Sequence, residues 1–444
     1  MLLFYCTKRK PYSLKIDNLH YKLILQKNIL PFNFLKTILK SGINYFYINL
    51  ADRIVAFFSF ILLARIFDSQ LYGKISTVFA VSTILVTILD FGLPVYMQRE
   101  SSKTEDLSDI LANVFSVKIP FLILYIFILP LVSWVFLKDI PRGIVIIIGV
   151  IILLQSISNL LSYAYFGKDN SKLVLRANIV SKVLFLIVIT TSYFFLRNIY
   201  FFLSGYIIAY VYTLLVFTIN IKHYKVDISK LILNFKKLKF TLAIIIPIGL
   251  SSVFNLIYDK IDIVILSAYL DYNKVAQYSV AYTIYRLSGI VFGIILYPAL
   301  NQFSRLSEDL FKSIKLLIKY LIINIVVSVI IIIIFINVIN GLIPVLFSSK
   351  YLEASDLLTL LIFAVLFWSM NSIVGVYLNG MGYYKDVMKA TLVGVVINIS
   401  ANIILIPKIG VWGAVYSTIL TEIIILLFEI ISVLKIIRTK KILI

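Results

Sequence analysis

The stretch Leu256–Leu270, LIYDKIDIVILSAYL, has apolar flanks typical of a membrane span, yet it carries Asp259, Lys260 and Asp262 in its interior. A charged side chain near the centre of a bilayer costs from about 2.5 to more than about 10 kcal/mol. Such side chains must therefore face one another or a water-filled cavity rather than lipid. The stretch predicts a spanning helix whose polar residues are turned toward the interior of a helix bundle.

The rest of the chain has the composition of a membrane protein. Of its 444 residues, 61% are hydrophobic and only 14% are charged, against roughly 25% charged in soluble proteins; the mean hydropathy is +1.01. We expect an all-α polytopic membrane protein, because apolar runs of about 20 residues cross the ~30 Å hydrocarbon core as helices. The predicted spans are 43–65, 72–95, 110–137, 142–166, 173–196, 199–220, 241–268, 277–301, 315–338, 354–379, 387–407 and 411–434.

The basic residues outside the spans are distributed unevenly between the two sides of the membrane. Placing both termini on one side gives that side 29 Lys and Arg residues. The other side has eight, namely Arg65, Lys74, Lys138, Arg142, Arg197, Lys274, Lys350 and Lys408. The positive-inside rule then predicts that both termini are cytoplasmic. The same bias explains most of the net charge of +21 as attraction to anionic headgroups, so we expect no nucleic-acid partner.

The two halves of the chain resemble each other. Asp52-Arg53-Ile54 precedes Tyr72-Gly73 at nearly the spacing by which Asp259-Lys260-Ile261 precedes Tyr278-Ser279. Six spans in each half give the halves the same orientation, as in transporters built from two lobes with a central cleft. The predicted organisation is a cytoplasmic N-terminal tail with a short surface helix (1–42), an N-lobe (43–220), a cytoplasmic connector (221–240), a C-lobe (241–434) and a cytoplasmic C-terminus (435–444).

Five basic residues fall within the predicted spans: Arg53, Lys118, Lys182, Lys260 and Arg286. An arginine stays charged and presents a planar fork to phosphate, so one interpretation is a cationic cavity for an anionic, phosphate-bearing substrate. The alternative is that these bases tie helices together by pairing with the acids of the spans, which are Asp52, Asp90, Asp259, Asp262, Glu422 and Glu429. One Cys, two distant His residues and the absence of a phosphate-binding loop motif indicate no metal site, no cofactor and no catalytic residues.

Several segments, in order along the chain, resemble a known family. They are LLARIFDSQLYGKISTVFAV (62–81), LDFGLP (89–94), DKIDIVILSAYLDYNKVAQYSVAYTIYRL (259–287) and NGMGYYKDVMKATLVGVVINISANIILIPKIGVWGAVYSTILTE (379–422). These segments are similar to the polysaccharide-export branch, or Wzx-type flippases, of the multidrug/oligosaccharidyl-lipid/polysaccharide (MOP) exporter superfamily. The resemblance covers roughly residues 35–435.

The resemblance implies about twelve transmembrane helices in two six-helix lobes around a V-shaped cavity. It implies a flippase of the bacterial inner membrane and not an enzyme. The expected cargo is an undecaprenyl-diphosphate-linked oligosaccharide of O-antigen, capsule or a related surface polysaccharide, which crosses the membrane by alternating access. It further implies a cationic cavity, coupling to a H⁺ or Na⁺ gradient in which the acids of the spans take part, and a monomeric transport unit. The expected partners are the lipid-linked glycan, membrane lipids and other polysaccharide assembly proteins.

Three other functions stay open at this stage. A small-molecule or drug exporter of the same superfamily would take cations in an acidic cavity, and a peptidoglycan-precursor flippase would have more spans than the twelve predicted here. A membrane glycan polymerase would need a large external loop with catalytic residues, whereas the longest predicted external stretch, near 339–353, is short and chemically plain.

Overall fold

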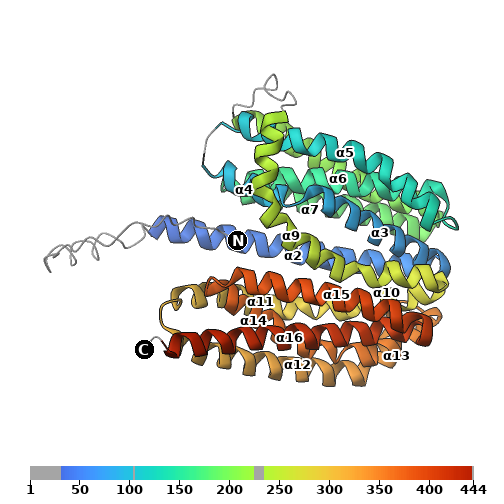
Figure 1. The fold of residues 1–444 in the computed structure, drawn as a ribbon. Helices are drawn as coiled ribbons and strands as arrows, with labels where there is room; N and C mark the ends of the chain where they lie inside the picture. The colour runs from blue at the N-terminus through green and yellow to red at the C-terminus, as the bar shows by residue number, and fades with distance from the viewer. Residues whose placement is uncertain (1–31, 104–105, 225–234, 443–444) are drawn as a thin grey trace, which may run out of the picture.

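The computed structural model describes residues 32–103, 106–224 and 235–442. Within these ranges every regular element is helical, with no strand, and the helices form two stacked lobes (Figure 1). This confirms the predicted fold class. The predicted tail up to residue 31 and the connector residues 225–234 lie outside the described residues.

The N-lobe contains α2 to α8 and two short helices. Their bounds are α2 Phe32–Ile66, α3 Ser69–Asp90, α4 Leu93–Ser101, α5 Ser108–Phe136, α6 Arg142–Gly167, α7 Ser171–Thr191, η1 Ser192–Leu196, α8 Ile199–Ile221 and η2 Lys222–Tyr224. The second half of the chain contains α9 Phe235–Tyr269, α10 Tyr272–Leu287, α11 Gly289–Arg305, α12 Leu310–Leu346, η4 Ser349–Tyr351, α13 Leu352–Leu361, α14 Ala364–Gly380, α15 Tyr384–Ile409 and α16 Val411–Ile442.

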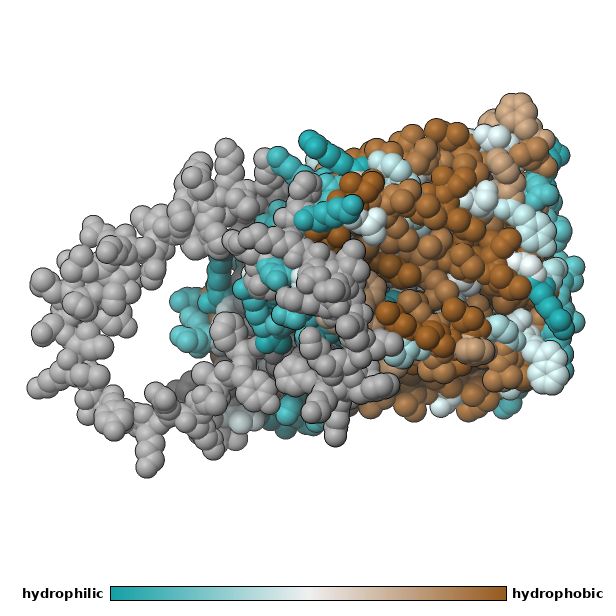
Figure 2. All heavy atoms as spheres, turned by 90° about the horizontal axis from the view of Figure 1, so that it is seen from above, coloured by the Kyte–Doolittle hydropathy of each residue, from teal (hydrophilic) through white to brown (hydrophobic). Residues whose placement is uncertain are grey.

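The helices are long and apolar enough to make this chain a multi-pass membrane protein. Eight helices of the described ranges could each cross a bilayer, or nine when the bent pair α13–α14 counts as one span. The other predicted spans correspond to α9, to α10 with α11, and to α16. A broad apolar band separates two hydrophilic ends (Figure 2). We call the end where α2 begins and α16 finishes the terminal end, and the opposite end the far end (Figure 1).

Three predicted spans are interrupted. The span 277–301 is two helices that meet at Ser288, whose hydroxyl donates to the Tyr285 carbonyl at 2.6 Å, a bond that competes with the helix ladder. The span 354–379 is bent by 50° between α13 and α14. The span 72–95 ends at Asp90, because Phe91 and Gly92 adopt left-handed backbone angles before Pro94 starts α4.

The start of the first span also differs from the prediction. A separate surface helix was expected to end near Gly42, but α2 runs without a break from Phe32 to Ile66. A single glycine costs a helix interior only about 1 kcal/mol, and Gly42 does not interrupt this one.

Helix α9 belongs to both lobes, so the second lobe does not begin cleanly at residue 241. Near its start, Ile245 packs in a cluster with Leu93 and Met97 of α4, whereas Leu266 near its end packs in the core shared with α10. Gly249 makes the first contact possible, because a Cβ there would lie 2.6 Å from the carbonyl carbon of Phe91. The helix therefore joins the two lobes through a close backbone approach.

At the far end the lobes are closed against each other. The Ser69 hydroxyl donates to Asn273 Oδ1 at 2.6 Å, and the Arg65 guanidinium donates to the carbonyls of Leu346 and Val345 at the end of α12. Gly73 of α3 lies so near α10 that a Cβ there would overlap the carbonyl oxygen of Tyr272. We call this set of contacts the far-end seal.

The interior of the N-lobe holds a buried ion pair. The Lys118 ammonium of α5, 1% exposed, contacts the carboxylate of Asp90 and the hydroxyl of Ser156. Ser156 in turn donates to Asp90 Oδ2 at 2.6 Å. These three side chains connect α3, α5 and α6, and every charge in the group has a partner, as a buried charge requires.

The far-end seal predicts the effect of Gly73→Leu. A larger side chain would push Tyr272 away and favour separation of the lobes at the far end. In a Cys6→Ser background, a Ser69→Cys/Asn273→Cys pair joined by a short thiol crosslinker reports closure, and we expect crosslinking to fall strongly in Gly73→Leu. Gly341→Leu is the control, because nothing lies within 4 Å of a Cβ there. Unchanged crosslinking in Gly73→Leu would contradict the described contact.

The buried pair predicts an asymmetric mutational pattern. Lys118→Met leaves the Asp90 carboxylate buried without its base, and we expect a loss of about 3–5 kcal/mol of stability, measured as thermal unfolding in detergent. The double variant Lys118→Met/Asp90→Leu should recover most of that loss. Lys103→Met, which removes the exposed partner of Glu100, should change stability by less than about 1 kcal/mol. A neutral Lys118→Met would show that the pair is not structural.

Candidate functional site

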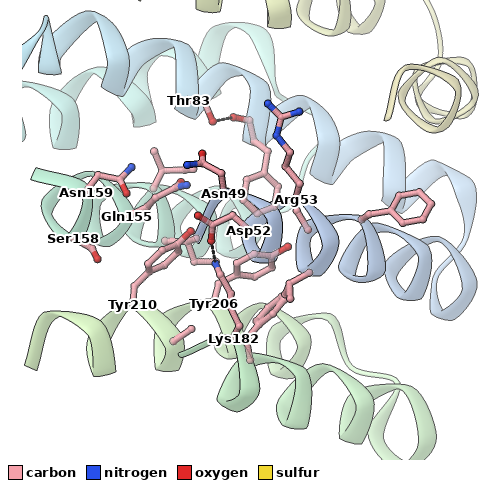
Figure 3. Close-up of a pocket in the computed structure, with 18 of the residues that line it drawn as sticks. Asn49, Asp52, Arg53, Thr83, Gln155, Ser158, Asn159, Lys182, Tyr206 and Tyr210 are labelled. Carbon is pink, nitrogen blue, oxygen red and sulfur yellow. Dashed lines mark hydrogen bonds and ion pairs between the residues drawn. The ribbon is translucent and has the colours of Figure 1, made fainter. Parts of the chain in front are cut away.

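A cavity of about 690 Å³ lies between the lobes. Its wall comes mainly from α2, α3, α6, α7 and α8 of the N-lobe, and α9 and α10 close the remaining side (Figure 3). The lining extends to Phe166, in the last turn of α6 at the terminal end, and to Tyr72 of α3, beside the far-end seal. The cavity therefore approaches the terminal end and is closed at the far end.

Four of the five predicted basic residues line this cavity: Arg53, Lys182, Lys260 and Arg286. The Lys182 ammonium on α7 lies 2.8 Å from Asp52 Oδ1 of α2, and the Asn178 amide donates to the same oxygen at 3.1 Å. The Lys182–Asp52 contact is the dashed line that joins these two labelled residues in Figure 3. Lys182 also lies 6.0 Å from the ring centre of Tyr210, so an acid and an aromatic face hold this base in place.

A second carboxylate serves two bases on the opposite wall. Asp259 Oδ2 lies 3.0 Å from Lys260 Nζ, and Asp259 Oδ1 lies 3.0 Å from Arg286 Nε. The Tyr282 hydroxyl donates to Oδ1 at 3.0 Å, which fixes the carboxylate further. The Arg286 side chain is still 40% exposed, and its guanidinium carbon is 5.8 Å from the ring centre of Trp368.

Arg53 has no acidic partner in the described part of the chain. It points away from the Asp52–Lys182 pair (Figure 3) and reaches toward the second lobe, where a Cβ on Gly289 would lie 3.4 Å from its Nη1. Arg286 and Asp259 are the charged groups of the second lobe that interact with it electrostatically. Three of the four bases therefore share two carboxylates and Arg53 has none among the described residues, which leaves an excess of positive charge between the lobes.

Uncharged polar side chains line the wall facing these charges. Gln155 and Asn159 stand one turn apart on α6 beside Ser158, and neither amide donates a hydrogen bond within the described residues. Tyr206 and Tyr210 of α8 face them across the cavity (Figure 3). Gln155 and Asn159 were not among the predicted site residues. The signal for them was the segment QSISN in an otherwise apolar span, because side chains four residues apart share one helix face.

The other predicted site residues lie outside the cavity lining. Lys118 and Asp90 form the buried pair of the N-lobe. Glu422 of α16, 1% exposed, accepts hydrogen bonds from Tyr258, Asn371 and Tyr285. Glu429 lies further along the same helix and is 4% exposed. Its Oε2 has no hydrogen-bond partner among the described residues.

Asp262 occupies a polar pocket inside the second lobe and has no basic partner among the residues that the structure describes. Its side chain is 2% exposed; Oδ2 accepts from the Tyr278 hydroxyl at 2.6 Å and from Thr418 at 3.1 Å, and Oδ1 accepts from Asn402 at 2.7 Å. The Asn402 amide also donates to Asn398 Oδ1 at 3.2 Å, so Asn402 connects Asn398 to the carboxylate. No group of three or more His, Cys, Asp or Glu side chains suited to a metal occurs in the described ranges.

Solved structures with a similar fold are transporters. The chain superposes on lipid II flippase MurJ in an inward closed conformation with a TM-score of 0.68, at 18% identity, over 89% of this chain and 87% of that one. It superposes on an inward-facing multidrug resistance MATE family transporter of the MOP superfamily with a TM-score of 0.70, at 12% identity, over 87% and 95% of the two chains. At these identities the similarity establishes the two-lobe fold.

Sequence comparison gives the family. An uncharacterised membrane protein of Methanocaldococcus jannaschii is 26% identical over 272 residues, which are 56% of this chain and 51% of that protein, so the match spans about half the length of that relative. The model of the polysaccharide biosynthesis protein family matches residues 38–304, which is more than half of the chain and agrees with the family expected from the sequence. The chain therefore belongs to the polysaccharide biosynthesis protein family, with the fold of the MOP superfamily of transporters.

Proposed function

We propose that this protein is a flippase for undecaprenyl-diphosphate-linked oligosaccharides of a bacterial surface polysaccharide. The observation that carries the proposal is the cavity with four bases, of which three share two carboxylates and Arg53 has no acidic partner within the described residues. A diphosphate matches this arrangement because guanidinium groups donate paired hydrogen bonds to phosphate oxygens. The family match to polysaccharide biosynthesis proteins supports the same substrate class.

The remaining wall suits a carbohydrate. Gln155, Asn159 and Ser158 offer amide and hydroxyl groups to sugar hydroxyls, and Tyr206 and Tyr210 offer flat faces on which sugar rings can pack (Figure 3). The polyprenyl tail stays in the bilayer, because lipid solvates it as well as any apolar groove does.

The transport step follows from the two ends of the cavity. With the terminal end in the cytoplasm of an inner-membrane protein, as the basic residues indicate, the cavity receives the glycan and diphosphate from the cytoplasmic side. The far-end seal then separates, the lobes close at the terminal end, and the glycan leaves on the outer side. Helix α9, which packs on both lobes, moves with each of them in this cycle.

The cavity charge argues against a drug exporter for cations, because an excess of bases repels a cationic substrate. A peptidoglycan precursor also carries a diphosphate and a glycan, so it is the closest alternative substrate, and the assay below includes it. Other polysaccharide assembly proteins would supply the lipid-linked unit and take it up after transport.

Arg53→Ala should weaken transport without disturbing the fold, because Arg53 makes no hydrogen bond or ion pair within the described residues. Loss of one charge-assisted contact to phosphate costs about 1.5–3 kcal/mol, which corresponds to roughly 10- to 100-fold in apparent substrate affinity. Arg53→Lys should retain part of the activity. The measurement is the movement of a fluorescent undecaprenyl-diphosphate-linked oligosaccharide in proteoliposomes, read by an impermeant quencher.

Arg305→Ala is the matched control, because Arg305 is an exposed arginine outside the cavity lining. Parallel vesicles contain a labelled peptidoglycan precursor or a cationic dye. Wild-type rates in Arg53→Ala, or movement of the dye alone, would rule out the proposed site. Faster movement of the peptidoglycan precursor than of other glycans would keep the site and change the substrate.

We further propose that Asp262 couples transport to a H⁺ or Na⁺ gradient. Its carboxylate is buried among neutral hydroxyl and amide groups, and a buried carboxylate that neutral donors surround takes up a proton or a cation more readily than one that is paired with a base. Asp52, Asp90 and Asp259 each have a basic partner and are therefore assigned to charge pairing. Glu422 and Glu429 lie on the same helix as Thr418 and form the secondary candidates for coupling.

Asp262→Asn should abolish the response of transport to an imposed ion gradient, because the amide keeps the shape but cannot exchange a proton or attract a cation. Initial rates are compared with and without inward or outward gradients of pH and of Na⁺. Asp309→Asn, at a partly exposed residue beside Lys312, is the control and should respond like the wild type. A gradient response that persists in Asp262→Asn would exclude this role.

A further inference from the structure

A second cavity of about 590 Å³ lies between α5 and α6, away from the central one. Its walls are almost entirely apolar, with Leu129 and Pro130 on α5 and Val145 and Leu153 on α6. At Gly149 the two helices come together, because a Cβ there would contact the Leu129 side chain. Gly149, which has no side chain, therefore lets Leu129 of α5 lie against the α6 backbone.

This cavity faces the lipid rather than the protein core. In the most apolar stretch of α5 only 17% of the residues are buried. Trp134 is 67% exposed, Ile146 is 60% exposed and Ile126 is 56% exposed, and all three line the cavity. The side of the N-lobe seen in Figure 2 is likewise covered with apolar side chains between its two hydrophilic ends. The space is therefore an open groove on the membrane surface of the protein.

The length of the groove matches one leaflet. Its lining extends from Tyr125 of α5 to Lys138 just after that helix. This is about 20 Å at ~1.5 Å per residue, and half of a hydrocarbon core of ~30 Å is about 15 Å. An acyl chain that enters at the far end would reach the bilayer midplane where the groove ends. A polyprenyl chain that crosses both leaflets is too long for it.

The only charged side chains in the lining are two bases at the far end. They are Lys138, just after α5, and Arg142, at the start of α6. Asp139 stands between them in sequence but is not part of the lining, and it lies close to Tyr272 of α10 on the other side. The groove thus has an apolar floor and a positively charged mouth at headgroup depth.

We propose that this groove is a binding site for an anionic phospholipid of the leaflet at the far end. One acyl chain lies between α5 and α6, and Lys138 and Arg142 contact the phosphate. The bound lipid would fill the space between two helices of the N-lobe and stabilise their packing. The inference rests on this groove alone and does not depend on the substrate proposed for the central cavity.

The test is photo-crosslinking of the full-length protein in nanodiscs. The probe is phosphatidylglycerol with a diazirine in its acyl chain, compared with the phosphatidylethanolamine analogue, and labelled peptides are mapped by mass spectrometry. We expect labelling of α5 and α6 with a preference for phosphatidylglycerol. Lys138→Glu/Arg142→Glu should lower that labelling by at least roughly tenfold, because each base near a lipid surface contributes about fivefold. Arg197→Glu, exposed at the same end, should leave it unchanged.

A second variant keeps the proposal testable if reversal of both charges prevents folding. Ile146→Trp would fill the groove from an exposed position and should reduce labelling by both lipids. Val135→Trp, at an exposed residue of α5 outside the lining, is its control. Equal labelling by the two lipids in the wild type, or labelling that persists in both groove variants, would overturn the proposal.

Discussion

A charge within a bilayer must be matched by another charge or by water, and this constraint determines how both lobes are built. The Lys118–Asp90 pair meets it with matched charge, the lysine fully buried and the carboxylate mostly buried. Asp259 meets it by serving two bases at the cavity wall. Arg53 meets it only because the cavity admits water. The number of oppositely charged partners therefore distinguishes charged side chains that stabilise the fold from those that remain available to bind a substrate.

The closure of one end of the cavity depends on contacts of a different kind. The far-end seal uses a hydroxyl–amide hydrogen bond, guanidinium–carbonyl hydrogen bonds and a glycine contact, with no buried ion pair. A neutral hydrogen bond contributes about 0.5–1.5 kcal/mol and a hydrogen bond from a charged group about 1.5–3 kcal/mol. Because Arg65 is exposed, the seal can open without leaving a buried charge unpaired. The charged residues line the cavity, where a bound substrate could change the relative stability of the open and closed arrangements of the lobes.

Much of the fold could be predicted from the sequence, since apolar length and charge bias are local properties. The spans, the helical class and the grouping of Arg53, Lys182 and Arg286 around one space follow from the cost of charge in lipid. The breaks at Ser288 and between α13 and α14 could not, because they depend on side chain–backbone bonds and packing within otherwise apolar runs. Lys118 could not be separated from the cavity bases, because its partner Asp90 is distant in sequence and only the helix packing brings them together.

The two carboxylates of the cavity have a role beyond neutralising bases. A cavity with four unpaired bases would hold a diphosphate strongly in every conformation, and tight binding in both states of an alternating-access cycle favours neither. Asp52 and Asp259 hold Lys182, Lys260 and Arg286 in place and lower the net charge that the substrate meets. In the proposed cycle, the substrate would bind through the remaining excess charge near Arg53 and would leave when that arginine moves with α2 away from Gly289 of the other lobe. Partial neutralisation would thus allow the proposed cationic cavity to release an anionic cargo.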